Sequence, residues 1–123
     1  MKTVLIVDDD PSILKIASMR LRAEGVEILT ASDGAEGLRL IREHRPHVVV
    51  LDLMMPKVHG FTVLQQVRSD PLLRNIKVLV TSAKGYASDV ERVRQLGADR
   101  YLHKPYALQE FWEVVSELLG ERK

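Results

Sequence analysis

The chain has 123 residues, which is enough for one domain with an ordinary hydrophobic core and leaves no room for a second. It contains no cysteine, so disulfides, thiolate metal sites and a cysteine nucleophile are excluded. Eighteen basic and 17 acidic residues leave a net charge of +1, which does not indicate a nucleic-acid or membrane partner. The apolar runs are too short to span a bilayer and the N-terminus lacks a signal-peptide pattern, so we expect a cytoplasmic protein.

Short β-branched runs alternate along the chain with longer amphipathic segments, which is the pattern of parallel β-α units. In chain order, the first half predicts a strand over Thr3–Val7, a helix from Asp10-Pro11 to near Gly25, a strand over Val26–Ala31, a helix capped by Asp33 that ends before Pro46, and a strand over His47–Leu51. The second half predicts a helix over Phe61–Ser69, a strand over Lys77–Thr81, a helix from the capping pattern Ser88-x-x-Glu91 to Gly97, a strand over Arg100–His103 and a helix over Leu108–Leu119.

These five β-α units account for the whole chain and leave no segment over for a linker or a second domain. The predicted fold is therefore α/β, a single domain over residues 1–123. It is built on a doubly wound, five-stranded parallel sheet with helices on both faces. We expect the strand order 2-1-3-4-5, one of the two common orders for such sheets.

Polar residues follow four of the five predicted strands. They are Asp8-Asp9-Asp10, Asp52, Thr81-Ser82 and Lys104-Pro105. Any one of these alone is typical of a turn, a helix cap or a strand end. Because the carboxyl ends of parallel strands meet at one edge of a sheet, their occurrence at four strand ends predicts a shared site there.

The residue types at this edge suit phosphoryl chemistry. Clustered carboxylates at Asp8, Asp9 and Asp52 repel one another, and a divalent cation among them relieves the repulsion. Oxygen ligands without nearby histidine or cysteine suit Mg²⁺ or Mn²⁺. With Lys104, the three carboxylates and the cation sum to zero charge. A carboxylate such as Asp52 can attack phosphorus, and the Ser82 hydroxyl can donate to a phosphoryl oxygen.

Four motifs together resemble the receiver domain of two-component response regulators, and the resemblance covers essentially the whole chain. They are Val4-Leu5-Ile6-Val7-Asp8-Asp9-Asp10, Asp52-Leu53-Met54-Met55-Pro56-Lys57-Val58-His59-Gly60, Ser82-Ala83, and Gly97-Ala98-Asp99-Arg100-Tyr101-Leu102-His103-Lys104-Pro105-Tyr106. Each motif alone is moderately specific, and their order and spacing make the set highly specific.

The resemblance implies a phosphoacceptor and a metal site. Asp52 would receive a phosphoryl group from a phosphohistidine on a sensor histidine kinase or a histidine phosphotransfer protein. Asp9 and Asp52 would bind Mg²⁺ directly together with the Met54 backbone carbonyl, and Asp8 would act mainly through metal-bound water. Lys104 would neutralise the phosphoryl group.

The resemblance also implies a switch. Ser82 would move to bond the phosphoryl group, and Tyr101 would swing inward into the space that Ser82 leaves. The surface of the fourth helix, the last strand and the last helix would then change and bind a downstream protein target or output domain. Without the resemblance, Tyr101 is simply a packing aromatic. The Lys104–Pro105 bond would be cis.

Other functions are distinguished by single features. An aspartate-nucleophile phosphohydrolase usually carries a second aspartate two residues after the nucleophile, and Met54 stands there, so we expect catalysis only of the chain's own phosphorylation and dephosphorylation. Met54 and Lys84 stand where the family tunes water access, and the lack of a side-chain donor at Met54 predicts slow self-dephosphorylation.

The remaining alternatives concern partners. No helix-turn-helix segment follows the last helix, so we expect no output domain and no direct nucleic-acid contact in this chain, whether it stands alone or is excised from a larger transcriptional regulator. A nucleotide-binding module is disfavoured because no glycine-rich phosphate loop follows any strand. We expect a monomer or a phosphorylation-dependent dimer, and no membrane association.

Overall fold

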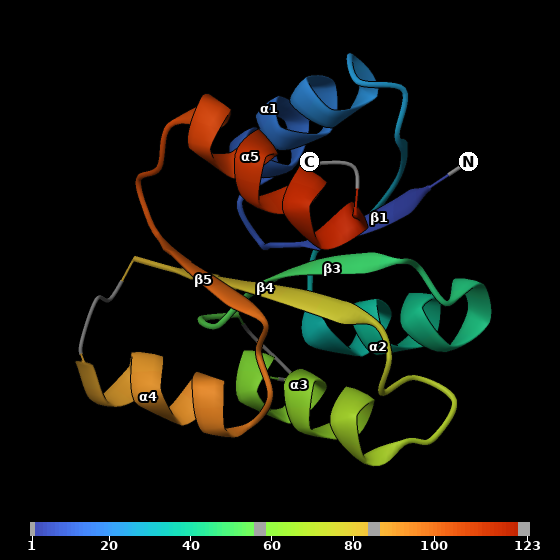
Figure 1. The fold of residues 1–123 in the computed structure, drawn as a ribbon, viewed down its shortest axis with the longest axis vertical. Helices are drawn as coiled ribbons and strands as arrows, with labels where there is room; N and C mark the ends of the chain where they lie inside the picture. The colour runs from blue at the N-terminus through green and yellow to red at the C-terminus, as the bar shows by residue number, and fades with distance from the viewer. Residues whose placement is uncertain (1, 56–58, 84–86, 121–123) are drawn as a thin grey trace.

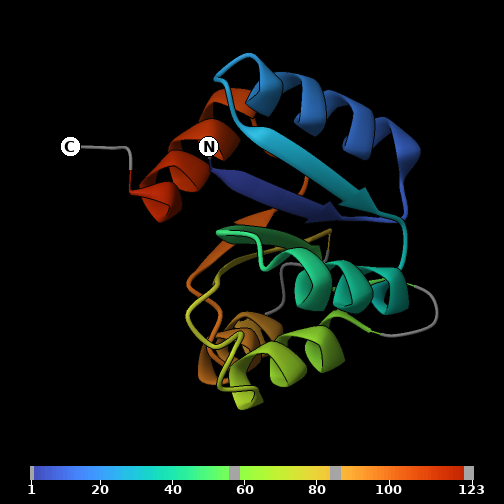
Figure 2. The same cartoon turned by 90° about the vertical axis from the view of Figure 1, so that its right-hand side faces the viewer.

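The computed structural model describes residues 2–55, 59–83 and 87–120, and in them five parallel strands form one sheet in the order β2-β1-β3-β4-β5, as predicted. The strands are β1 (Thr3–Val7), β2 (Glu27–Ala31), β3 (Val48–Asp52), β4 (Lys77–Ser82) and β5 (Arg100–His103). The helices are α1 (Pro11–Arg22), α2 (Gly34–His44), α3 (Gly60–Ser69), α4 (Ala87–Gln95) and α5 (Leu108–Leu119). Helices α1 and α5 cover one face of the sheet, and α2, α3 and α4 cover the other (Figure 1, Figure 2).

Alternating residues of the central strands contribute to two separate hydrophobic cores, one on each face of the sheet. Val4 and Ile6 of β1 pack with the cluster that includes Phe111 of α5, whereas Leu5 and Val7 pack with the core under α2, α3 and α4. Successive side chains of a strand point to opposite faces, so a strand covered on both faces must be apolar throughout. All five residues of β3 are buried, which places its last residue, Asp52, at the edge of a rigid central strand.

Side-chain caps start the first two helices as predicted. The Asp10 carboxylate accepts a hydrogen bond from Ser12 N at 2.9 Å ahead of α1, and the Asp33 carboxylate accepts one from Glu36 N at 2.8 Å ahead of α2. The capping assignment for the fourth helix was wrong, because α4 already includes Ala87 and Ser88 lies inside it.

Four predicted strand limits differ by one residue from the structure. Strands β2 and β3 begin one residue later than predicted, at Glu27 and Val48, and both β3 and β4 extend one residue further than predicted. The register continues through these added residues, with Asp52 opposite Thr81 and Ser82 opposite His103. Two predicted site residues are therefore held by strand pairing and do not belong to loops. Lys84 and the Pro56-Lys57-Val58 part of the acceptor loop lie outside the described residues.

Gly60 allows the start of α3 to touch the end of β3. A Cβ at this position would lie 2.7 Å from the carbonyl oxygen of Asp52 and 2.7 Å from the Cα of Leu53, which is closer than real Cβ contacts. The Gly60 N–H also donates to the Leu53 carbonyl at 3.3 Å. The absence of a side chain at Gly60 thus keeps α3 against the backbone that carries Asp52.

We predict that Gly60→Ala lowers the free energy of unfolding by about 2–3 kcal/mol, because its methyl group meets backbone atoms that cannot move independently of the sheet. The control is Gly25→Ala, where φ is +79° but no atom lies within 4 Å of the new Cβ. Only backbone strain of about 1 kcal/mol is expected at Gly25. Urea unfolding at pH 7 measures both values, and a Gly60 variant no less stable than the Gly25 variant would contradict the steric explanation.

Candidate metal centre at the carboxyl edge of the sheet

Three carboxylates meet where β1 and β3 end side by side. The ligand oxygens of Asp8, Asp9 and Asp52 all lie within 4.8 Å of one another. Asp8 and Asp52 are buried, with 2% and 4% of their surface exposed, while Asp9 is exposed. Such an all-oxygen set with one side open to water fits Mg²⁺, which binds through a few carboxylates and keeps several waters. The predicted Asp8, Asp9 and Asp52 cluster is therefore present.

Lys104 reaches this cluster from the end of β5. Its Nζ lies 2.7 Å from Asp8 Oδ2 and 3.4 Å from Asp52 Oδ2. Burial by itself would lower the pKa of Lys104, but the hydrogen bond to Asp8 and the charges of Asp52 and Asp8 outweigh it and raise the pKa. Lys104 therefore stays a cation between the two buried carboxylates.

Backbone N–H groups orient the second oxygen of each buried carboxylate. Asp8 Oδ1 accepts a hydrogen bond from Asp10 N at 2.9 Å, and Asp52 Oδ1 accepts one from Met54 N at 3.2 Å. The contribution of Met54 visible in the structure is this N–H, while its side chain is 48% exposed at the rim of the site. Each buried carboxylate is thus held between a chain N–H and the Lys104 ammonium.

The single lysine does not balance the buried charge. Burial raises the pKa of Asp52 from its ordinary 3.8 to about 6, and the neighbouring charge of Asp8 adds to the rise. Lys104 and the Met54 N–H act in the opposite direction and offset only part of it. The ionised site therefore carries unrelieved repulsion of the kind that a bound divalent cation removes.

The two predicted switch residues, Ser82 and Tyr101, lie on the neighbouring strands β4 and β5. Ser82 ends β4 with 1% of its surface exposed, and its carbonyl accepts a hydrogen bond from Lys104 N at 2.9 Å. Tyr101, opposite Val80 in the register, is partly buried and packs against the core under α2, α3 and α4. The Lys104–Pro105 bond is cis, as the sequence resemblance implied.

A family comparison agrees with this geometry, since residues 4–116 match the model of the response regulator receiver domain. The chain belongs to this family. It is a receiver domain of two-component signalling systems, and its acidic cluster is consistent with a Mg²⁺ site.

Relatives of this receiver domain differ in how much chain surrounds it. The polar-differentiation response regulator DivK of Brucella anthropi is 35% identical over 98% of both chains. The DNA-binding dual master transcriptional regulator RpaA of Synechocystis is 40% identical, and the match spans 97% of this chain but 49% of RpaA. The structure of the Francisella response regulator 1452 receiver domain superposes with a TM-score of 0.90 at 30% identity, covering 100% of both chains. In the described residues, no helix is long and apolar enough to cross a membrane.

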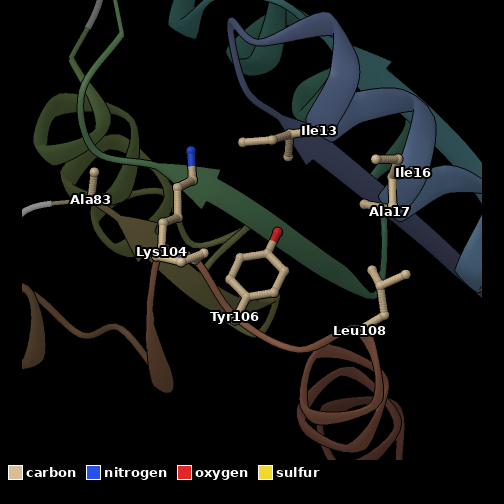
Figure 3. Close-up of a pocket in the computed structure, with 8 residues that line it drawn as sticks. Ile13, Ile16, Ala17, Ala83, Lys104, Tyr106 and Leu108 are labelled. Carbon is tan, nitrogen blue, oxygen red and sulfur yellow. The ribbon is translucent and has the colours of Figure 1, made fainter.

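Sequence reasoning included Tyr106 in a family motif but gave it no role, and it did not predict the pocket beside it. A pocket of about 470 Å³ opens next to Lys104, and its walls are mainly apolar side chains of α1 and of the segment that leads into α5. Figure 3 shows the Tyr106 ring between Lys104 and Leu108, with Ile13 and Ile16 across from it on α1. The Tyr106 ring stacks on Phe111 with a centroid distance of 5.4 Å. An aromatic residue two positions after the lysine was the only available sequence signal.

Tyr106 also takes part in the electrostatics of the site. Burial, reinforced by the negative charges of Asp8 and Asp52, raises the pKa of Tyr106 to about 12. Its hydroxyl therefore stays protonated at neutral pH and adds no negative charge to the acidic edge.

The raised pKa of Asp52 makes the stability of the receiver domain depend on pH. The folded chain holds the proton of the Asp52 carboxyl group more tightly than the unfolded chain, so protonation of Asp52 stabilises the fold. This stabilisation is present below pH 4 and is lost as the pH rises through about 6. We predict that Asp52→Asn, measured in EDTA, is more stable than wild type by about 1–2 kcal/mol at pH 7.5, with solvent screening taken into account. The gain should shrink by more than half at pH 4.5.

The matched control for this pH effect is Asp10→Asn. Asp10 belongs to the same acidic run but caps α1, and asparagine caps a helix about as well as aspartate. Urea unfolding of the three proteins at both pH values checks the prediction. An Asp52→Asn protein that is less stable than wild type at pH 7.5 would show that its carboxylate is net stabilising there.

Proposed function

We propose that Asp52 is the phosphoacceptor of this receiver domain and that Asp8, Asp9 and Asp52 hold Mg²⁺ during phosphorylation. The observation that supports this most is the convergence of the three carboxylates within 4.8 Å, with Lys104 Nζ beside two of them. Bound Mg²⁺ supplies positive charge that offsets both the carboxylates and the phosphoryl oxygens. The Met54 backbone carbonyl is proposed as a further ligand.

The chain's own groups have distinct roles in the proposed transfer. An ionised oxygen of Asp52 attacks phosphorus and forms an acyl phosphate, while the bond from phosphorus to the donor imidazole breaks and its electron pair stays on the nitrogen. Burial and the charge of Asp8 raise the pKa of Asp52 to about 6 in the absence of metal, so its carboxyl is mostly ionised at neutral pH and available as a nucleophile. Lys104 and the Ser82 hydroxyl then bond the phosphoryl oxygens.

The proposed switch couples Ser82 to the surface of α4, β5 and α5. Ser82 and Tyr101 lie on paired strands, so a shift of the Ser82 side chain toward a phosphoryl group changes the space available to the Tyr101 ring. Tyr101 also lines a cavity of about 210 Å³ between α4 and β5. Room beside the ring supports an inward movement that alters this surface for a downstream protein.

The proposed partners follow from the chemistry of this receiver. A sensor histidine kinase or a histidine phosphotransfer protein supplies the phosphoryl group, and a downstream target or output domain responds to it. The relatives illustrate two arrangements of a response regulator. DivK has about the length of this chain, whereas RpaA is a DNA-binding regulator about twice as long. A single domain over residues 1–123 without an output domain, a cytoplasmic location, and a monomer or phosphorylation-dependent dimer stay predictions.

A phosphohydrolase acting on external substrates is the less favoured alternative. Met54 occupies the position where such an enzyme needs an acid, and its thioether cannot donate a proton. We therefore propose that catalysis is limited to the chain's own phosphorylation and dephosphorylation.

The direct test is acid-labile labelling of the protein by acetyl phosphate in Mg²⁺. We predict stoichiometric labelling of wild type, none of Asp52→Asn, and none of wild type in EDTA. Asp10→Asn should label like wild type, because the Asp10 carboxylate accepts from Ser12 N and is not part of the carboxylate cluster. Undiminished labelling of Asp52→Asn would move the acceptor to another residue.

The lifetime of the acyl phosphate tests the role of Met54. Its exposed side chain stands at the rim of the site and offers no hydrogen-bond donor to orient an attacking water. We predict that Met54→Asn shortens the half-life of labelled protein several-fold, because an amide can hold that water. The exposed Met19→Asn on α1 is the matched control. Equal half-lives for Met54→Asn and wild type would remove Met54 from the control of hydrolysis.

A further inference from the structure

A cation–π contact joins α4 to α3 away from the predicted switch residues. The guanidinium carbon of Arg92 lies 4.0 Å from the centre of the Phe61 ring. Arg92 belongs to the middle of α4, and Phe61 is the second residue of α3. The two helices lie side by side on the same face of the sheet (Figure 1, Figure 2).

Phe61 is tied to the backbone of the proposed acceptor. It follows Gly60, whose Cα packs so closely on Asp52 and Leu53 that a Cβ there would lie 2.7 Å from their backbone atoms. The Phe61 ring is also partly buried against the core under α2, α3 and α4. The backbone that carries the Phe61 ring is therefore packed directly against the backbone of Asp52 and Leu53.

Helix α4 has few other fixed contacts among its described side chains. Val93 is buried, with 1% of its surface exposed, while Val90 is only partly buried. On the β5 side, the cavity of about 210 Å³ lies between α4 and Tyr101. Val93 is thus the one buried side chain among those described in α4, and the helix has a cavity on one side and a cation–π contact on the other. A helix held in this way can shift by breaking the cation–π contact.

We propose that the contact between Arg92 and Phe61, here called the Arg92–Phe61 latch, holds α4 against α3 and is released when Asp52 is phosphorylated, so that the latch opposes phosphorylation. This inference rests on the proposed function. The latch lowers the free energy of one arrangement only, so by linkage it weakens any ligand that favours the other. An exposed cation–π contact changes such an equilibrium about two- to five-fold.

The test measures the affinity of the receiver for beryllofluoride, a phosphoryl mimic, by calorimetry in Mg²⁺. We expect Arg92→Gln to bind it about two- to five-fold more tightly than wild type. Arg94→Gln is the matched control, because Arg94 lies on the same helix but pairs with the exposed Glu91, and it should bind like wild type. Arg92→Lys keeps a positive charge, and its affinity for beryllofluoride should lie between the affinities of wild type and Arg92→Gln.

A double-mutant cycle separates the latch from a general loosening of α4. Phe61→Leu should tighten binding to the same extent as Arg92→Gln, and the double variant should bind no more tightly than either single variant. Unchanged or weaker binding by Arg92→Gln, or additive effects in the double variant, overturns the latch. A wild-type protein that neither binds beryllofluoride nor is labelled on Asp52 overturns the proposed function, and the latch with it.

Discussion

Repulsion between buried carboxylates, only partly relieved by one lysine, is the constraint on which the candidate site depends. Asp8 and Asp52 lie at the ends of adjacent strands, and the ammonium that stabilises them comes from the end of β5. Two strands, β3 and β4, separate β5 from β1, so this ion pair forms only when the whole sheet is in register. The remaining imbalance, visible in the raised pKa of Asp52, creates a place where positive charge is favourable.

Helices α5 and α4 differ in how many of their described side chains are buried. On the α5 face, Phe111, Val114, Val115 and Leu119 are buried, and Arg20 of α1 lies over the Trp112 ring. On the other face, Val93 is the one buried side chain among those described in α4, and Arg92 lies over the Phe61 ring. Of these two helices, α4 is therefore the one that a charge change at the carboxyl edge of the sheet can move more easily. A helix that can move in response to such a change is what a switch requires.

Sequence reasoning was most accurate where one residue type has one strong local preference. Asp10-Pro11 and Asp33 were correctly predicted as helix starts, because a capping carboxylate needs only its own neighbouring N–H groups. The predicted ends of β3 and β4 were one residue too early, at the residues before Asp52 and Ser82, because polar residues usually mark the end of a strand. In the structure, pairing of Asp52 with Thr81 and of Ser82 with His103 keeps both residues in the sheet. The pocket beside Tyr106 and the Arg92 contact with Phe61 were missed because they form between segments whose approach is not encoded locally.

The sequence by itself determined the alternation of strands and helices, the family and the residue types available at the strand ends, because periodicity and motifs are written along the chain. The tertiary structure decided which of those residues meet. It placed Asp8, Asp9 and Asp52 within 4.8 Å, brought Lys104 to 2.7 Å from Asp8, and packed Tyr101 against the core. Distances between side chains far apart in the chain depend on strand order, register and packing, which no local pattern contains.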